Sequence, residues 1–137
     1  MGRVLALDVG TVRIGVAVTD PLGFFAQGVT VLAAEGPWMD ELRKYVKQYD
    51  VERLLIGLPR RTDGSEGPEA VRMREIVEEL RLQFKDLILE MWDERFTTTI
   101  AQQTLIEGDV SRKKRKGQVD KVAAVLLLQN YLEHKRG

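Results

Sequence analysis

Two short apolar segments joined by a tight connection constrain this fold more than any other feature of the sequence. Residues 3–8 read Arg-Val-Leu-Ala-Leu-Asp, and residues 13–20 read Arg-Ile-Gly-Val-Ala-Val-Thr-Asp. Their aliphatic and β-branched content predicts two buried strands, and the short connection between them predicts a hairpin. Asp8 ends the first strand, where a carboxylate is costly to desolvate unless a cation or hydrogen-bond donors neutralise it. We therefore expect Asp8 to have a charged partner.

The hydrophobic pattern of the remaining chain predicts an α/β protein. Strands are expected at 27–33, 53–58 and 87–92, and helices at 38–49, around 73–84, at 97–107 and at 118–133. This order favours a mixed five-stranded sheet, with three antiparallel strands followed by two parallel ones and with helices flanking the sheet. Right-handed crossover connections would put the strand at 3–8 in its centre.

Three acidic positions on otherwise apolar segments indicate a divalent-metal site. Glu94, with its neighbour Asp93, closes the strand at 87–92, and Asp120 interrupts the apolar start of the last helix. Ligands of open α/β sheets collect at the carboxyl ends of the parallel strands, so Asp8 and Glu94 are expected to meet there. Each acid taken singly also fits a structural role, as a turn residue, a solvated strand end or a helix cap.

Composition narrows the class of protein and the kind of metal. The 137 residues suit one domain spanning 1–137, and a net charge of zero does not by itself indicate a nucleic-acid partner. The absence of cysteine excludes disulfides and thiolate zinc sites, while carboxylates suit Mg²⁺ or Mn²⁺. The chain has no apolar run of the ~20 residues that a membrane helix needs and no signal-peptide pattern, so we expect a cytoplasmic protein without a membrane partner.

Clustered cations nevertheless predict contact with a polyanion. Residues 112–116 form an unbroken basic run just before Asp120, which we expect to be a loop, although Ser111 in front of it could start a helix. The glycine-containing loop at 60–68 suits a lid that faces phosphates. Both segments could instead be ordinary solvated loops. The candidate nucleic-acid contacts are Arg13, Arg60, Arg61, Arg95, Arg112, Lys113, Lys114, Arg115 and Lys116.

Four blocks, in this order along the chain, resemble the YqgF family, also called RuvX. They are Asp8-Val-Gly-Thr-Val-Arg-Ile-Gly15, then Gly57-Leu-Pro59 with Asp63-Gly64 and Glu66-Gly67, then Trp92-Asp-Glu-Arg-Phe-Thr-Thr98, and finally Lys116 to Asp120 with Ala123-Ala124. The resemblance implies an RNase H-like fold and a Mg²⁺-dependent endonuclease that resolves Holliday junctions or matures the 5′ end of precursor 16S rRNA. It maps the family's acids to Asp8, the Asp93-Glu94 pair and Asp120.

On this basis Asp8 is predicted to bridge two metal ions, with Glu94 and Asp120 each completing one site and Asp93 acting indirectly as the fourth catalytic residue. Symmetric cleavage of branched DNA would need two related active sites, and hence a homodimer. Two alternatives remain open. One is a non-catalytic nucleic-acid-binding module of the same fold, associated with ribosomal precursors. The other is an actin-like ATPase, which shares the Asp-x-Gly-Thr signature but needs two lobes.

Overall fold

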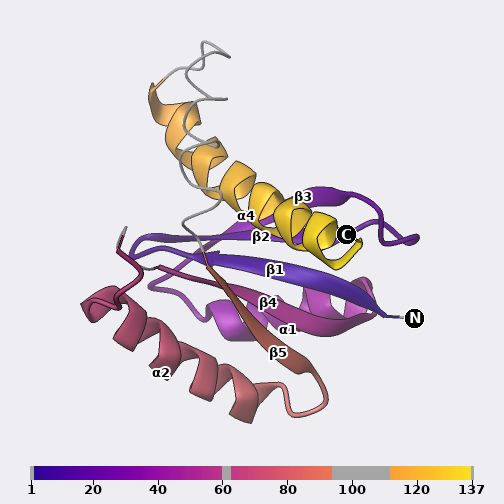
Figure 1. Cartoon of the computed structure of the whole chain (residues 1–137), viewed down its shortest axis with the longest axis horizontal. Coiled ribbons are helices and arrows are strands. Elements are labelled where there is room, and N and C mark those ends of the chain that lie inside the picture. Colours follow the sequence, from indigo (N-terminus) through magenta and orange to yellow (C-terminus); the bar gives the residue numbers. More distant parts are fainter. Residues whose placement is uncertain (1, 60–62, 94–111, 137) are drawn as a thin grey trace.

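The computed structural model describes residues 2–59, 63–93 and 112–136 (Figure 1). All five predicted strands and the first two predicted helices are confirmed, with bounds that shift by a few residues. The helix predicted at 97–107 lies outside the described residues. The elements are β1 (Arg3–Val9), β2 (Arg13–Thr19), β3 (Ala26–Ala33), α1 (Trp38–Gln48), β4 (Val51–Leu58), α2 (Pro68–Gln83), β5 (Ile88–Asp93) and α4 (Arg112–Arg136).

The five strands form one mixed sheet in the order β3-β2-β1-β4-β5. Strands β1, β2 and β3 are antiparallel neighbours, whereas β4 is parallel to both β1 and β5. The predicted topology is therefore confirmed, with β1 in the centre. Leu7 pairs with Val16 on one side and with Ile56 on the other.

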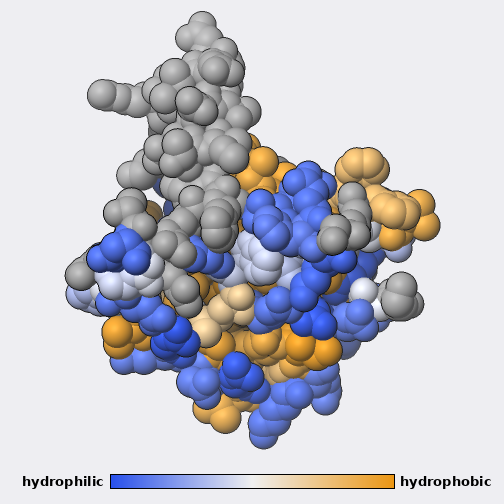
Figure 2. All heavy atoms as spheres, in the orientation of Figure 1, coloured by the Kyte–Doolittle hydropathy of each residue, from blue (hydrophilic) through white to orange (hydrophobic). Residues whose placement is uncertain are grey.

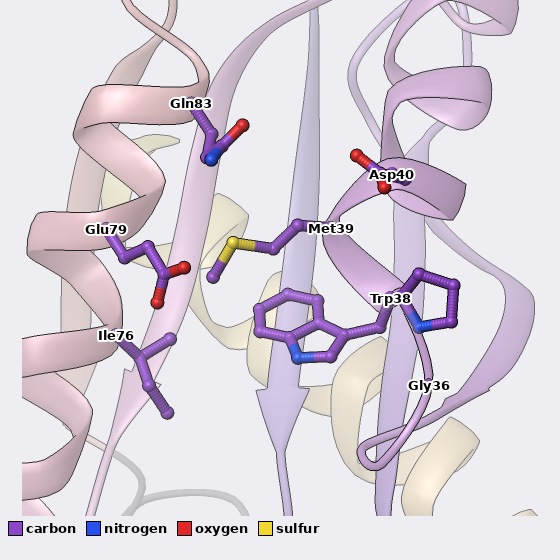
Figure 3. A pocket seen from close by; sticks show the side chains of 8 residues that line it. Gly36, Trp38, Met39, Asp40, Ile76, Glu79 and Gln83 are labelled. Atoms are coloured by element: carbon purple, nitrogen blue, oxygen red, sulfur yellow. The ribbon is translucent and has the colours of Figure 1, made fainter.

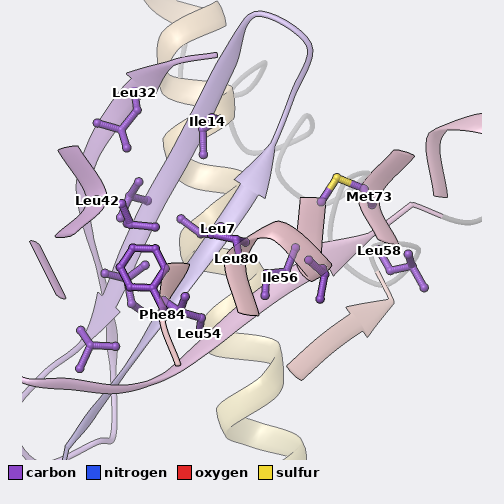
Figure 4. Close-up of a cluster of buried hydrophobic side chains, with 14 of the residues drawn as sticks. Leu7, Ile14, Leu32, Leu42, Leu54, Ile56, Leu58, Met73, Leu80 and Phe84 are labelled. Carbon is purple, nitrogen blue, oxygen red and sulfur yellow. The ribbon is translucent and has the colours of Figure 1, made fainter. Parts of the chain in front are cut away.

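The two faces of the sheet carry separate hydrophobic cores because successive side chains of a strand point to opposite sides. Leu5, Leu7, Leu54 and Ile56 belong to the larger core, together with residues of α1 and α2 (Figure 4). On the other face, Ala6, Ala17 and Leu55 pack with α4 residues that include Ala124, Leu127 and Leu128. Figure 1 shows α4 on one side of the sheet and α1 and α2 on the other. Within the described ranges, no helix has both the length and the apolar character that crossing a bilayer requires.

The hairpin that follows Asp8 depends on a glycine. The Gly10 N–H donates a 2.8 Å hydrogen bond to the Arg13 carbonyl, which closes the turn between β1 and β2. A Cβ atom at Gly10 would lie 2.7 Å from that same oxygen, closer than an unstrained contact allows. The predicted hairpin is confirmed, and its geometry requires the absence of a side chain at this position.

The start of the last helix differs from the prediction. We expected a loop over 112–116 and a helix from 118, but α4 begins at Arg112, so the basic run is helical. Its first turn contains no acidic residue, and cations at a helix N-terminus oppose the helix dipole. Arg and Lys nevertheless have high intrinsic helix propensity, and a single Gly117 costs only about 1 kcal/mol relative to alanine. The continuous apolar helix that follows outweighs both penalties.

Candidate active site at the carboxyl edge of the sheet

Asp8 lies near the carboxyl end of the central strand, half-buried and opposite Gly15 of β2. Leu7, the residue before Asp8, pairs with Ile56 of β4. The next residue of β4, Gly57, pairs with Trp92 of β5. Strand alternation turns Asp8 to the same face as Ala6, which packs against α4. The side chains of Asp8 and Trp92 thus emerge at one level of the sheet, on the side that α4 covers.

The last residue of β5 faces the other way. Asp93 pairs with Leu58, and it follows Trp92, which packs in the core on the α4 side. Met91 belongs to the opposite core, under α1 and α2, and alternation puts Asp93 on that side too. Asp93 and Asp8 therefore leave the sheet on opposite faces. Glu94 lies outside the described residues.

Asp120 belongs to the helix that covers the Asp8 face. It precedes Ala124 by four residues and Leu128 by eight, and both of these are fully buried against the sheet. The backbone of α4 starts beyond the edge of the sheet at which β1 ends and runs back across the sheet (Figure 1). The Asp120 side chain lies outside what the structure describes, so Asp8 is the one predicted ligand described in full.

The predicted metal site is thus only partly described. No group of three acidic, histidine or cysteine side chains that could hold a metal ion occurs among the described residues. Two of the three predicted ligands, Glu94 and the side chain of Asp120, fall outside that set. The lone histidine, His134, packs edge-on against Trp92 near the C-terminal end of α4.

The predicted phosphate contacts are also only partly described. Arg13 begins β2, immediately after the hairpin turn that follows Asp8. The run at 112–116 forms the first turns of α4, and its side chains are not described. Arg60, Arg61 and Arg95 lie outside the described residues. Strand β2 and helix α4 therefore both begin near the edge at which β1 ends, each with a predicted cationic contact.

Polar contacts that sequence reasoning missed hold α4 on the sheet. The indole N–H of Trp92 donates a 2.8 Å hydrogen bond to Oδ1 of Asn130, and the Ala26 N–H donates a 3.0 Å bond to Oε1 of Gln129. The Trp92 and Tyr131 rings meet edge to face, with their centroids 5.3 Å apart. Three consecutive residues of α4 therefore attach it to both outer strands of the sheet. The one sequence signal was a polar pair, Gln129-Asn130, inside an apolar helix.

A charged cluster on the same face extends this attachment. Glu90 of β5 accepts a 2.6 Å hydrogen bond from Arg53 of β4 and a 3.2 Å bond from the Tyr131 hydroxyl, and Lys135 lies 3.7 Å from it. Burial raises the pKa of the Tyr131 hydroxyl above its ordinary value of 10.0, and the negative charge of Glu90 adds to this effect. The neutral phenol is therefore the form that fits this position.

The opposite end of the sheet carries an exposed apolar turn between β2 and β3. Leu22, Phe24 and Phe25 are all more than half exposed. Figure 2, in the orientation of Figure 1, shows hydrophobic atoms gathered at the surface where the β2–β3 turn lies. Asp20 fixes the turn by accepting hydrogen bonds from the N–H groups of Phe24 and Phe25. The bond from Phe25, above all, holds the pKa of the Asp20 carboxyl below its ordinary value of 3.8. This turn is remote from Asp8.

Comparison with known proteins identifies one family over almost the whole chain. The family described as "RuvX: Holliday junction resolvase" matches residues 2–134. A protein of Halothermothrix orenii named "Putative pre-16S rRNA nuclease" is 44% identical over 135 residues, which cover 97% of this chain and 96% of that protein. A relative of the same name from Heliobacterium modesticaldum is 48% identical over 138 residues, covering 97% and 90%.

Solved structures share the fold at much lower sequence identity. The Fowlpox virus resolvase in complex with Holliday junction DNA superposes with a TM-score of 0.60 at 11% identity, and the match covers 98% of this chain and 99% of the resolvase. T. thermophilus RuvC in complex with its Holliday junction substrate gives a TM-score of 0.55, also at 11% identity, with coverage of 98% and 96%. These likenesses confirm the predicted RNase H-like fold.

Proposed function

We propose that this chain, which belongs to the RuvX family of Holliday junction resolvases, is a metal-dependent endonuclease acting on structured nucleic acid. Its substrate would be a four-way DNA junction, the 5′ end of precursor 16S rRNA, or both. The family is named for the first substrate and the relatives for the second. The proposal covers residues 1–137 as a single nuclease domain.

The structural observation that best supports the proposal is the position of Asp8. Its carboxylate is half-buried near the end of the central strand, on the face that α4 covers. A carboxylate in this position is costly to desolvate without a compensating charge. No described ion pair involves Asp8, and the basic start of α4 lies beyond the edge of the sheet at which β1 ends. A bound cation would supply the missing charge.

The donor set fits Mg²⁺ or Mn²⁺. Asp8, Glu94 and Asp120 would hold the metal, because these hard cations prefer carboxylate oxygens and the chain has no cysteine. When bound, the metal would stabilise the charge that develops on the phosphate and lower the pKa of water. We assign Asp93 an indirect role, supported by the strand alternation that turns it away from the Asp8 face.

The protein's own cations would orient the nucleic acid. The run from Arg112 to Lys116 begins a helix, so its charges would follow one another along a helical backbone at the edge where β1 ends. Arg13 follows the Asp8 hairpin, and we assign Arg60, Arg61 and Arg95 to the same surface. Such contacts bind phosphate without regard to sequence, which suits a substrate recognised by its shape.

We further propose a cytoplasmic protein, because chromosomal DNA and precursor rRNA occupy that compartment in bacteria, the source of the relatives. If the substrate is a four-way junction cut symmetrically, the active form would be a two-fold dimer that supplies two equivalent sites. Cleavage of precursor RNA at one position would not require the dimer.

A parallel cleavage assay tests the proposed function. The purified chain is incubated with a four-way DNA junction, a precursor 16S rRNA fragment and a linear duplex of matched length, each with Mg²⁺, Mn²⁺ or EDTA. We expect cleavage of the junction or the precursor that needs metal and exceeds cleavage of the linear duplex. Binding to these substrates without cleavage under any metal condition would instead support the non-catalytic module.

A further inference from the structure

A surface groove on the sheet face opposite α4 lies between α1 and α2. Its volume is about 310 Å³, and its apolar lining includes Trp38 and Met39 from α1 and Ile76 from α2. Figure 3 shows the Trp38 indole and the Met39 side chain between the two helices. All three side chains are half-buried, so the groove presents apolar atoms that the core does not fully cover.

Two carboxylates flank this apolar lining. Asp40 extends from α1 and Glu79 from α2, one on each side of the groove (Figure 3). Neither makes an ion pair or a side-chain hydrogen bond with any other described residue. Two other acids nearby do have a cationic partner, since Glu66, just before α2, pairs with Arg74 at 2.6 Å and Glu78 of α2 pairs with Arg81 at 3.2 Å. The groove therefore combines an apolar lining with two uncompensated negative charges.

The ends of the groove differ. At one end Arg43 of α1 donates a 3.0 Å hydrogen bond to the Gln83 carbonyl and a second bond to the Gln83 side-chain oxygen, which ties α1 to α2. At the other end a smaller pocket of about 220 Å³ shares Trp38 and Ile76, is also lined by Arg72 of α2, and reaches Gly10 in the hairpin that follows Asp8. An extended chain segment could thus enter from the hairpin end and stop at the Arg43–Gln83 bridge.

We propose that this groove binds a lysine or arginine side chain presented by a basic segment of a protein partner. The cationic head would lie between Asp40 and Glu79 and over the Trp38 ring, because carboxylates and aromatic faces both attract cations. The aliphatic stem would pack on Met39 and Ile76, as long basic side chains do on apolar surface. The two carboxylates repel a phosphate backbone, so this face suits a protein rather than nucleic acid. The inference goes beyond the nuclease function and does not depend on it.

The two tryptophans provide a specific readout of binding. Trp38 lines the groove, whereas the Trp92 indole N–H is engaged by Asn130 on the opposite face of the sheet. The chain has two tryptophans, so an NMR spectrum of the full chain contains one indole N–H signal for each. The probe is the capped peptide acetyl-Ala-Arg-Leu-Arg-Ala-amide, and its partner is the same peptide with citrulline in place of arginine, which keeps the shape and removes the charge. We expect the arginine peptide to shift the Trp38 signal saturably while the Trp92 signal stays fixed.

A matched pair of variants separates the groove from general surface charge. The double variant Asp40→Asn/Glu79→Gln should weaken binding about tenfold, as expected when two partly exposed ion pairs are lost. The control Glu41→Gln/Glu75→Gln removes one carboxylate from each of the same helices, outside the groove, and should bind as the wild type does. Equal binding of the citrulline peptide, an unmoved Trp38 signal, or equal losses in both variants would overturn the proposal. So would a single-stranded oligonucleotide that shifts Trp38 more than the arginine peptide does.

Discussion

The indole N–H of Trp92 lies 2.8 Å from Oδ1 of Asn130, and this hydrogen bond joins β5 to α4. Strand β5 ends at Asp93, directly before Glu94, and α4 carries Asp120. The bond therefore connects the two elements that would bring acids to Asp8 from either side. Its position on the α4 face makes it a structural support for the proposed site.

The Trp92–Asn130 bond is expected to contribute to stability. Asn130→Ala leaves the indole N–H without its acceptor, which should cost about 1–2 kcal/mol in the free energy of unfolding. In a Trp92→Phe background the donor is already absent, so the same substitution should cost clearly less. Urea denaturation of the four proteins measures the difference, with Glu133→Ala as an exposed control on the same helix. Equal costs in both backgrounds would show that the bond contributes nothing.

Gly10 is expected to be the least replaceable residue of the Asp8 hairpin. Gly10→Ala puts a Cβ atom 2.7 Å from the Arg13 carbonyl oxygen, so the turn must shift, at a cost of about 1–3 kcal/mol. Gly36→Ala is the matched control, because its nearest contact would be an ordinary 3.6 Å to the Ala33 oxygen. Thermal unfolding should show a lower Tm for the first variant and little change for the second. A Gly10→Ala protein as stable as Gly36→Ala would contradict this account of the turn.

Stability should fall at alkaline pH partly through Tyr131. Its pKa is raised in the folded protein by burial and then by Glu90, so the folded state holds the phenolic proton more tightly than the unfolded state does. The resulting stabilisation is fully present below the ordinary value of 10.0 and is lost as pH rises from there through the folded pKa. Urea unfolding between about pH 8 and 11 should show a smaller decline for Tyr131→Phe than for the control Tyr45→Phe. Identical declines would mean that Tyr131 does not contribute.

Much of the fold could be predicted from the sequence because its signals are local. The alternation in 13–20 and the aliphatic run in 3–8 indicate strands directly, and the position of Asp8 at a strand end follows from the same pattern. The bond between Trp92 and Asn130 could not be predicted, since it joins residues 38 apart and leaves no periodic trace. The predicted start of α4 was wrong because the charges of the basic run disfavour a helix locally. Packing of the apolar part of α4 stabilises the helix in spite of them.

The two adjacent acids at the end of β5 should differ in their effect on cleavage. Alternation turns Asp93 to the α1 and α2 side, whereas Asp8 faces α4, so Glu94 is our choice for the metal ligand. Glu94→Gln should abolish cleavage at every Mg²⁺ concentration. Asp93→Asn should lower the cleavage rate only partially, as substitutions of residues that orient a metal ligand without touching the metal do. Single-turnover rates across a Mg²⁺ series measure both. An inactive Asp93→Asn beside an active Glu94→Gln would reverse the assignment.

The most direct test of the proposed metal site is the cleavage rate of Asp8→Asn, measured together with its thermal stability. The amide keeps the volume of the side chain and removes its charge, so we expect no metal-dependent cleavage and a Tm equal to or above that of the wild type, because repulsion among the acids falls. The control is Asp86→Asn, which makes the same change of charge at an exposed position and should keep full activity. An Asp8→Asn protein that still cleaves with Mg²⁺, or that loses activity only because it unfolds, would contradict the proposed role of Asp8.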